Sequence, residues 1–332
     1  MATDLESMPN TLTSLSPINP IPELNTDNSH NNDTSNISEK QMDNEASFFA
    51  TFVDGSSFRN MIEYIRLPNV EGVFRFTKYN IFYEQGDQDN NILNIVELKT
   101  YELTDYQFTS KSDEIIVGIN LSDLRNITRN VGKKDHIDLY KLPDEPKSLY
   151  IQIRSQSEKG TSNLYHLPIT TIHYTVYKLP EYMRNKKQPT CTVYQSDFSK
   201  LCKSLVTIKC SHAMVHGFQN GVVYKGILNT GAIGSVKEFG KCHTDNVTNN
   251  LKSILPSRGN IIKSSRPPPK LNIGEVGEIE RFRIDISIIK FLIKLNALSP
   301  TGTVKMYIEK GLPLKMVCNI GTFGKMSIYI MG

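Results

Sequence analysis

The sequence has no tryptophan, and cysteine is scarce, with five in 332 residues. Their odd number and lack of paired spacing argue against a disulfide scaffold and indicate a reducing compartment. The five are Cys191, Cys202, Cys210, Cys242 and Cys318. No apolar run approaches the roughly 20 residues that cross a bilayer, so no membrane partner is expected. The first ten residues lack a basic segment followed by an apolar stretch, so no secretory signal is expected either.

Motifs of the common enzyme and cofactor classes are also missing. The segment Gly234–Lys241 has one residue too many between its glycines for a Walker loop, and Cys242 follows where serine or threonine is needed. No glycine-rich dinucleotide motif occurs. Cys210, His212 and His216 match none of the usual spacings of zinc ligands. The sequence therefore predicts a protein that is not an enzyme and that holds no metal and no cofactor.

Charge is distributed unevenly along the chain. Lys and Arg number 38 against 34 Asp and Glu, which leaves a net charge of +4. Residues 1–46 contain eight acids and one base, a charge of −7, so the remainder carries +11. Because residues 1–46 are rich in Asn, Ser, Thr and Pro, they are predicted to be a disordered acidic tail. Breaks in the apolar pattern predict an interdomain linker at 175–190 and a mobile insertion at about 243–277.

The apolar residues in the rest of the chain follow two different spacings. Alternating β-branched and aromatic residues predict strands, among them Val73–Phe76, Leu93–Leu98, Ile137–Tyr140, Leu149–Ile153, Val222–Tyr224, Val304–Ile308 and Met326–Ile330. Four short segments instead have the i, i+3, i+4, i+7 spacing of amphipathic helices, with stripes over 58–65, 124–131, 198–205 and 288–295. Ser56, Ser122, Ser196 and Ser287 are expected to cap them.

Each predicted helix carries two basic residues beside or opposite its apolar stripe. They are Arg59, Arg66, Arg125, Arg129, Lys200, Lys203, Lys290 and Lys294. Acids are fewer there, with Glu63, Asp123 and Asp197. A single such helix is typical of an ordinary solvated face, but four together indicate a shared basic surface for a polyanion. The same order of helices and strands occupies 47–174 and 191–332, which predicts two copies of one fold.

Four segments combine helix, turn and basic residues in a recognisable way. Gly118–Leu124 and Gly132–Ile137 flank the second helix, and Gln195–Leu205 contains the third with two lysines. Phe291–Val304 contains the last helix and its Ser-Pro-Thr-Gly turn. Together they resemble the DNA sliding clamps of the proliferating cell nuclear antigen family, by pattern over about residues 47–332.

That resemblance implies an α+β fold of two similar clamp-type domains, 47–174 and 191–332. Antiparallel sheets would lie outside, and four helices would line the inner face of a homotrimeric ring. The implied function is a DNA polymerase processivity factor that encircles double-stranded DNA without reading its sequence. The bases that match the family's DNA-facing positions are Arg59, Arg66, Arg129, Lys200, Lys203 and Lys294, and helix phase adds Arg125 and Lys290. The expected partners are two further copies, DNA polymerase, other replication and repair proteins that bind clamps, and a clamp loader.

The resemblance also implies two kinds of contact surface. Subunits would join through edge strands near 163–172 and 233–239. Clamp-binding peptides would enter a pocket formed by Leu93, Ile95, Tyr177, Leu179, Pro180, Pro313 and Tyr329, although each of these residues also suits ordinary strand packing.

The net basic folded region, the tail and the insertion depart from the family pattern. They keep a second function open, a transcription or scaffold subunit with the clamp fold that forms no loaded ring. A nucleic-acid-processing enzyme is a more distant alternative. The departures also suggest a divergent clamp from a large DNA virus. The expected location is the nucleus or, for a viral protein, the site of viral DNA replication.

Overall fold

The computed structural model describes residues 46–89, 91–155, 161–174, 177, 179, 188–241 and 277–331. The chain divides into two units, Met1–Ser38 and Glu39–Gly332, and the whole described fold belongs to the second. The predicted tail and insertion, and most of the predicted linker, lie outside the described residues.

The first half of the fold, here called the first repeat, begins with β1 (Phe48–Phe52) and ends with β9 (Ser162–Pro168). Between them lie α2 (Gly55–Ile65), β2 (Glu71–Thr77), β3 (Asn80–Gly86), β4 (Ile92–Lys99), η1 (Thr100–Glu102), β5 (Asp105–Phe108), β6 (Glu114–Asn120), α3 (Leu121–Thr128), β7 (His136–Lys141) and β8 (Ser148–Arg154).

The second repeat begins with β10 (Cys191–Tyr194) and ends with β17 (Gly324–Ile330). Between them lie α5 (Gln195–Thr207), β11 (Cys210–Phe218), β12 (Asn220–Leu228), β13 (Ile233–Lys241), β14 (Glu278–Asp285), α7 (Ile286–Leu292), η2 (Ile293–Ala297), β15 (Thr303–Tyr307) and β16 (Leu314–Ile320). Each strand named from the sequence lies within one of these strands, except that Ile308 falls one residue past the end of β15.

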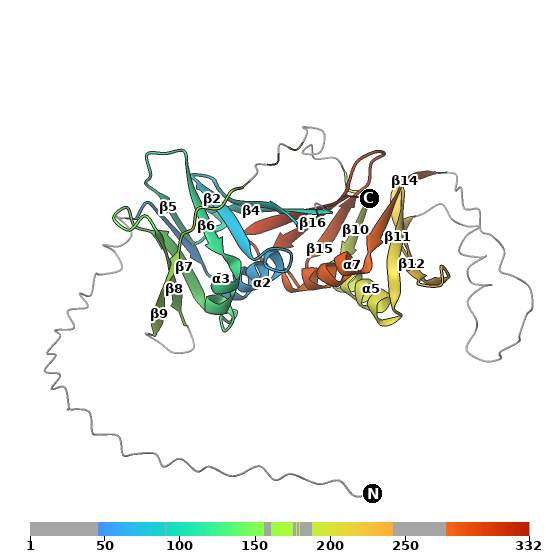
Figure 1. The fold of residues 1–332 in the computed structure, drawn as a ribbon, viewed down its shortest axis with the longest axis horizontal. Helices are drawn as coiled ribbons and strands as arrows, with labels where there is room; N and C mark the ends of the chain where they lie inside the picture. Colours follow the sequence, from blue (N-terminus) through green and yellow to red (C-terminus); the bar gives the residue numbers. More distant parts are fainter. Residues whose placement is uncertain are drawn as a thin grey trace, which may run out of the picture. The chain divides into compact units, whose positions relative to one another are not determined.

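Strand order shows that the two repeats have the same fold. The order β1-β7-β8-β9 in the first repeat corresponds to β10-β15-β16-β17 in the second. The order β4-β3-β2-β6 likewise corresponds to β13-β12-β11-β14. Neighbouring strands such as β7 and β8, or β11 and β12, pair antiparallel. The α+β fold with two similar repeats is therefore confirmed (Figure 1).

A strand joint connects the repeats. Strand β17 pairs antiparallel with β4, from Gly324 opposite Leu98 to Ile330 opposite Ile92, and so builds a continuous sheet of eight strands. Fully buried Met326 lies opposite buried Val96 in this joint. The strands that correspond to β17 and β4 in the other repeats are β9 and β13, and each is the edge of its described sheet.

The helices bury the apolar residues that the sequence predicts to face the core, with one difference in the fourth helix. Phe58, Met61, Ile62 and Ile65 are all buried, as are Phe198, Leu201, Cys202 and Leu205. In the fourth helix Ile289 is buried, whereas Ile288 is only half-buried. The α-helix there ends at Leu292 and continues as the 3₁₀-helix η2, whose three-residue turn changes which side chains share a face.

The expected serine caps are wrong for α2 and α3. The Asp54 carboxylate accepts from the backbone of Ser57 at the start of α2, and the Asn120 side chain accepts from Ser122 and Asp123 at the start of α3. Both caps lie before the serines, because carboxylate and amide oxygens serve as well as hydroxyls at this position. The residues preceding α5 and α7 make no side-chain cap bond.

Candidate nucleic-acid interface and outer surface

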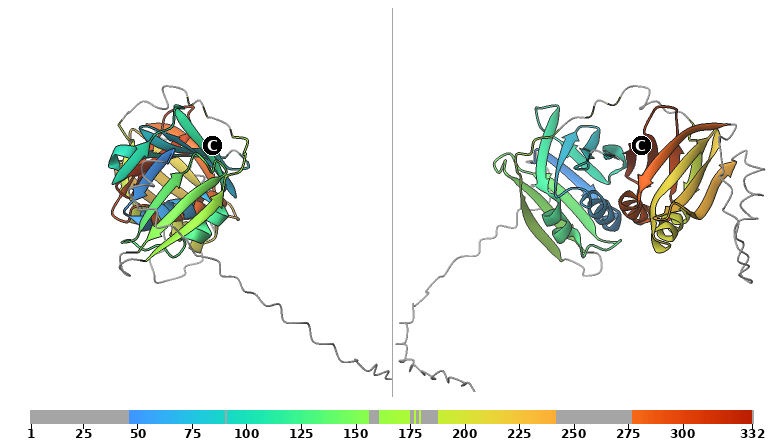
Figure 2. Two further views of the ribbon diagram at one scale, coloured as in Figure 1. Left: turned by 90° about the vertical axis from the view of Figure 1, so that its left-hand side faces the viewer. Right: turned by 45° about the vertical axis from the view of Figure 1, so that its right-hand side comes forward.

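The four helices lie side by side in one row. α3 contacts α2, α2 contacts η2, and α5 contacts both α7 and η2. Figure 2 (right) shows α2, in blue, beside the red α7–η2 segment, with α3 and α5 at the two ends of the row. Because the buried stripes face the sheets, the remaining helix faces form one continuous surface, here called the helix row.

A close approach holds α2 against the turn that follows α3. The Gly55 amide donates to the Asp135 carbonyl at 3.0 Å. A side chain at Gly55 would place its Cβ 2.4 Å from Val131 Cγ1 and 2.6 Å from that carbonyl oxygen, so only glycine fits there. Arg59 adds a bond from its guanidinium to the Val131 carbonyl at 2.7 Å. One predicted DNA-facing base therefore also joins two helices.

The structure brings the eight predicted bases onto the helix row with unequal exposure. Arg129, Lys200, Lys203, Lys290 and Lys294 are exposed, whereas Arg59, Arg66 and Arg125 are half-buried. The side chain of Lys200 is 77% exposed and that of Lys294 is 53% exposed, so these ammonium groups are free to meet a ligand from solvent.

Acidic residues neutralise part of this charge. Lys200 lies 3.1 Å from Asp197 within α5, and Lys294 lies 3.9 Å from Glu63, across the boundary between the repeats. Exposed ion pairs of this kind contribute about 0–1 kcal/mol and exchange partners readily. With Asp123 as the third acid, eight bases against three acids leave a positive surplus on the helix row.

Three further lysines extend the helix row but were not predicted as part of it. Exposed Lys133 and Lys134 lie in the turn after α3, and exposed Lys209 follows α5 with a φ of 58°. Burial acts to raise the pKa of the Asp54 carboxyl, but hydrogen bonds from Ser57 and Ser56 and the charge of Lys133 lower it overall. Lys133 is thus close to the start of α2. The Gly-Lys-Lys sequence of this turn indicates exposed bases, but helical periodicity does not detect bases that lie in a turn.

Part of the predicted peptide pocket comes together on the outer face of the eight-stranded sheet. Leu93 on β4 lies opposite Tyr329 on β17, and Ile95 lies opposite Ser327. Leu93 and Tyr329 are buried, whereas Ile95 and Pro313 are half-buried. Tyr177 and Leu179 are half-buried, with the Leu179 amide donating to the Tyr177 carbonyl, and Pro180 lies outside the described residues.

Lys315 on β16 belongs to the same outer surface and was not predicted there. Its ammonium lies over the rings of Tyr307, at 5.4 Å, and Tyr329, at 5.5 Å. Burial lowers the pKa of Lys315, assisted by the nearby charge of Lys325. Contacts between a cation and two tyrosine rings stabilise this half-buried group and hold Tyr329 in place.

The cysteine and the histidines that the sequence singles out, Cys210, His212 and His216, lie on β11, apart from the helix row and the outer surface. Within the described residues, no group of three or more His, Cys, Asp or Glu side chains is arranged to hold a metal ion. Cys210 is buried, while His216 lies 3.1 Å from the Glu278 carboxylate. None of the described helices combines the length and apolar character required to span a bilayer.

Comparison with known proteins finds similarity among solved structures. No protein-family model matches the chain, and no curated protein matches it. Among solved structures, the proliferating cellular nuclear antigen of Entamoeba histolytica is similar, with a TM-score of 0.61 and 13% sequence identity. The alignment covers 86% of this chain and 98% of that one. It lends no support to a viral origin. At this identity the similarity shows the fold, and the chain has the DNA clamp fold with two clamp-type repeats.

Proposed function

We propose that the protein is a DNA sliding clamp, a homotrimeric ring that encircles duplex DNA and tethers a polymerase and other replication or repair proteins. The observation that carries the proposal is the helix row, in which four helices from both repeats present a surplus of basic side chains on one surface. The fold shared with a proliferating cellular nuclear antigen supports it.

The strand order supports assembly into a ring. Within the chain, β17 joins β4, and the corresponding strands β9 and β13 are sheet edges. If β9 of one copy joins β13 of the next, every joint in the assembly has the same antiparallel form. Identical head-to-tail joints close into a ring when the rotation between neighbouring copies adds up to a full turn, and a closed ring would leave neither of these edges exposed. Three copies supply six repeats and twelve helices.

The ring would retain DNA by electrostatic attraction and by encircling it. Duplex DNA carries one negative charge per about 1.7 Å of axis, and lysine or arginine side chains near the phosphates release bound counterions. Contacts to phosphates carry no sequence information, so the ring would hold any duplex and still slide. The eight bases need no cofactor and perform no reaction, which is consistent with a scaffold that is not an enzyme.

Client proteins would bind the outer surface around Leu93, Ile95 and Tyr329. Apolar and aromatic walls beside a sheet suit a short peptide that inserts a few apolar anchors. A clamp loader would be needed to open a closed ring. The proposed location is wherever DNA is copied, which is the nucleus or, for a viral protein, the viral replication site.

Assembly and loading test the proposed function directly. Mass photometry at micromolar concentration is expected to show a particle of three chains, about three times the 37.6 kDa of one chain. The protein is expected to remain on nicked circular DNA after loading and to leave when the circle is cut. A stable monomer at this concentration would refute the ring.

A second function remains a specific alternative, a clamp-fold scaffold subunit that does not form a loaded ring. The exposed polar residues Asn163 on β9 and Lys237 on β13 favour it, because they weaken an edge-to-edge joint. Equal retention on linear and circular DNA would support this alternative.

Replacement of Ile95 by alanine is expected to weaken peptide binding at least about fivefold, since it removes an apolar wall of the outer surface. Fluorescence polarisation with a synthetic clamp-binding peptide that carries a few apolar anchors would measure the affinity. Ile95 is half-buried, so folding should survive. Thr192→Ala, at an exposed position on β10, is the control. Unchanged affinity of Ile95→Ala would place the peptide elsewhere.

A further inference from the structure

Two exposed tyrosines lie together at one end of the first repeat. Tyr79, in the turn between β2 and β3, is 68% exposed, and Tyr101, on η1, is 73% exposed. The Thr100 amide and hydroxyl both donate to the Tyr79 carbonyl, at 3.1 and 2.8 Å, so the two tyrosines are joined through the residue next to Tyr101. Aromatic side chains this exposed contribute little to a core, and two of them on one surface indicate a binding site.

Each tyrosine ring has its own lysine. The Lys78 ammonium lies 5.7 Å from the centre of the Tyr79 ring, and the Lys99 ammonium lies 5.3 Å from that of Tyr101. A hydrogen bond with the Tyr101 hydroxyl is the main cause that raises the pKa of Lys99, so this group stays charged near neutral pH. These four residues, here called the tyrosine platform, combine two aromatic rings with two cations.

Acids neutralise only part of the charge on the tyrosine platform. Lys99 lies 3.7 Å from Glu102, and Glu97, which also acts on the pKa of Lys99, is paired with Lys325 at 2.6 Å. Exposed ion pairs of this kind contribute about 0–1 kcal/mol and exchange readily for another anion. Exposed Lys78 has no carboxylate within ion-pair distance among the residues that the structure describes. Both lysines are therefore available to an anionic ligand.

Hydrogen bonds hold the backbone of the tyrosine platform in place. The Thr77 hydroxyl accepts from the amides of Tyr79, at 3.4 Å, and Asn80, at 3.0 Å, and donates to the Asn80 carbonyl at 2.8 Å. The Tyr106 hydroxyl donates to the Thr77 carbonyl at 2.6 Å. A surface that is ordered before it binds loses little conformational freedom on binding, so more of the contact energy remains as affinity.

The fold does not require these exposed aromatic residues. By strand order, the turn between β2 and β3 corresponds to the turn between β11 and β12 in the second repeat. There the chain passes from Phe218 through exposed Gln219 to Asn220, without a tyrosine in the turn, and the two strands still pair. Folding therefore does not account for Tyr79, and binding does.

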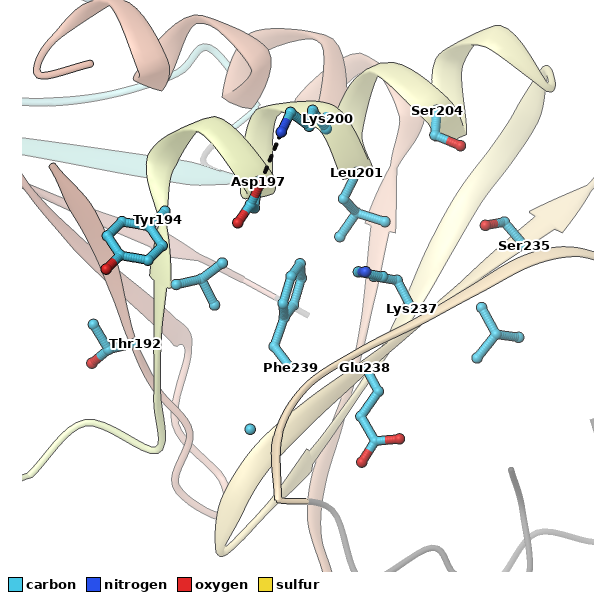
Figure 3. A pocket seen from close by; sticks show the side chains of 13 residues that line it. Thr192, Tyr194, Asp197, Lys200, Leu201, Ser204, Ser235, Lys237, Glu238 and Phe239 are labelled. Atoms are coloured by element: carbon cyan, nitrogen blue, oxygen red, sulfur yellow. Dashed lines mark hydrogen bonds and ion pairs between the residues drawn. The ribbon is translucent and has the colours of Figure 1, made fainter. Parts of the chain in front are cut away.

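The tyrosine platform would stay open in the proposed ring. The sheet edges that would join copies are β9 and β13. The open groove between β13 and α5, about 560 Å³ and lined by Leu201 and Phe239, belongs to the second of these edges (Figure 3). The tyrosine platform lies on η1 and on the ends of β2 and β4, so the joints between copies would not cover it.

A short path connects the tyrosine platform to the helix row. The carbonyl of buried Phe323 accepts from the Lys99 amide at 3.0 Å. Two residues earlier, Gly321 lies so close to α2 that a Cβ there would be 2.9 Å from the Ser57 hydroxyl oxygen. The tyrosine platform therefore lies beyond the end of the helix row at which α2 begins, within reach of a strand that leaves a duplex held on that row.

We infer that the tyrosine platform binds single-stranded DNA, with unpaired bases stacked on Tyr79 and Tyr101 and the adjoining phosphates in contact with Lys78 and Lys99. Aromatic rings stack on any base and lysines neutralise the backbone, so this combination is typical of binding without sequence preference. The bases of a duplex are already stacked and paired, so a duplex does not offer them to the rings. That the strand is DNA rests on the proposed function, whereas the stacking contact needs no ring.

Loss of both rings tests the stacking contact. Tyr79→Ala/Tyr101→Ala is expected to weaken binding of a short fluorescent oligothymidine at least about tenfold, measured by fluorescence polarisation at low salt, because the bases lose their aromatic partners. Both side chains are exposed, so circular dichroism should show an unchanged fold. Tyr79→Phe/Tyr101→Phe keeps the rings and should bind within about twofold of the unchanged protein. Val70→Ala, at a 61% exposed apolar position directly before β2, is the matched control. Unchanged affinity of the double alanine variant would overturn the inference.

The salt dependence tests the two lysines. Each phosphate neutralised on a single strand contributes about 0.7 to the slope of log affinity against log salt concentration, so Lys78→Ala/Lys99→Ala should make the slope shallower by about 1.4. An unchanged slope would show that these ammonium groups do not contact the phosphates.

Photo-cross-linking locates the bound strand. An oligothymidine with 5-iodouracil at single positions should cross-link to Tyr79 and Tyr101, identified by mass spectrometry of the digested protein. Cross-links only to the helix row would overturn the inference. Binding of oligouridine at least tenfold tighter than oligothymidine would overturn the assignment to DNA. A client protein that no longer binds the double alanine variant, while oligothymidine still does, would make this a protein-docking surface instead.

Failure of this inference and failure of the proposed function give different results. If the protein is trimeric and retained on circular DNA but oligothymidine binds the double alanine variant normally, the tyrosine platform is wrong and the ring stands. If the protein is monomeric and oligothymidine binding still requires the two tyrosines, the ring is wrong and the stacking contact stands. If the unchanged protein binds no oligothymidine, the inference falls whatever the duplex does.

Discussion

Simultaneous replacement of Lys200, Lys203 and Lys294 by alanine is expected to weaken retention on closed circular DNA at least about tenfold at 0.1 M salt. Each lysine that neutralises a phosphate contributes about 0.9 to the slope of log affinity against log salt concentration, so the slope should become shallower. The three ammonium groups are exposed on the helix row and are not buried in the core. The trimer should persist, because none of them lies on β9 or β13.

A charge-matched triple variant separates position from net charge. Lys111, Lys305 and Lys310 are exposed and lie outside the four helices. Their replacement by alanine removes the same charge and should change retention much less. If both triple variants lose retention equally, DNA responds to total charge and the helix row has no special role. If neither loses any at low salt, the helix row does not face DNA.

Replacement of Phe323 by alanine is expected to lower the free energy of unfolding by about 3–5 kcal/mol, the usual range for a buried phenylalanine. The ring closes the first repeat against Phe52, and its loss would leave a cavity at the joint of β17 with β4. Urea denaturation followed by circular dichroism measures the change. Because the joint connects the repeats, the transition is also expected to become less cooperative.

The neighbouring residue provides the control. Thr322 is exposed in the same turn, so Thr322→Ala should change the free energy of unfolding by no more than about 0.5 kcal/mol. A cost below 1 kcal/mol for Phe323→Ala would show that the turn does not close the first repeat.

Local patterns predicted the element types well because they depend on near neighbours. The spacing of Phe58, Met61, Ile62 and Ile65 requires only that one helix face meets a core, and the structure buries all four. The pattern was less accurate at the fourth helix, where η2 changes the residues per turn. Caps were misplaced because Asp54 and Asn120 compete with nearby serines for the same backbone amides.

The candidate surfaces differ in how far the sequence could reveal them. The basic residues of the helix row are visible in the sequence because charge opposite an apolar stripe is a local property. The contact of Lys315 with Tyr307 and Tyr329 is not, since three strands must pair before these side chains meet.

Periodicity and charge alone thus determined that this chain is a repeated α+β protein with cationic helices. Those properties are set within a few residues of backbone, where side-chain direction follows from helix or strand geometry. Only the tertiary structure decided that β17 joins β4 and that Phe323 packs into the first repeat. Such choices depend on the packing of segments far apart in the chain, for which local sequence carries no signal.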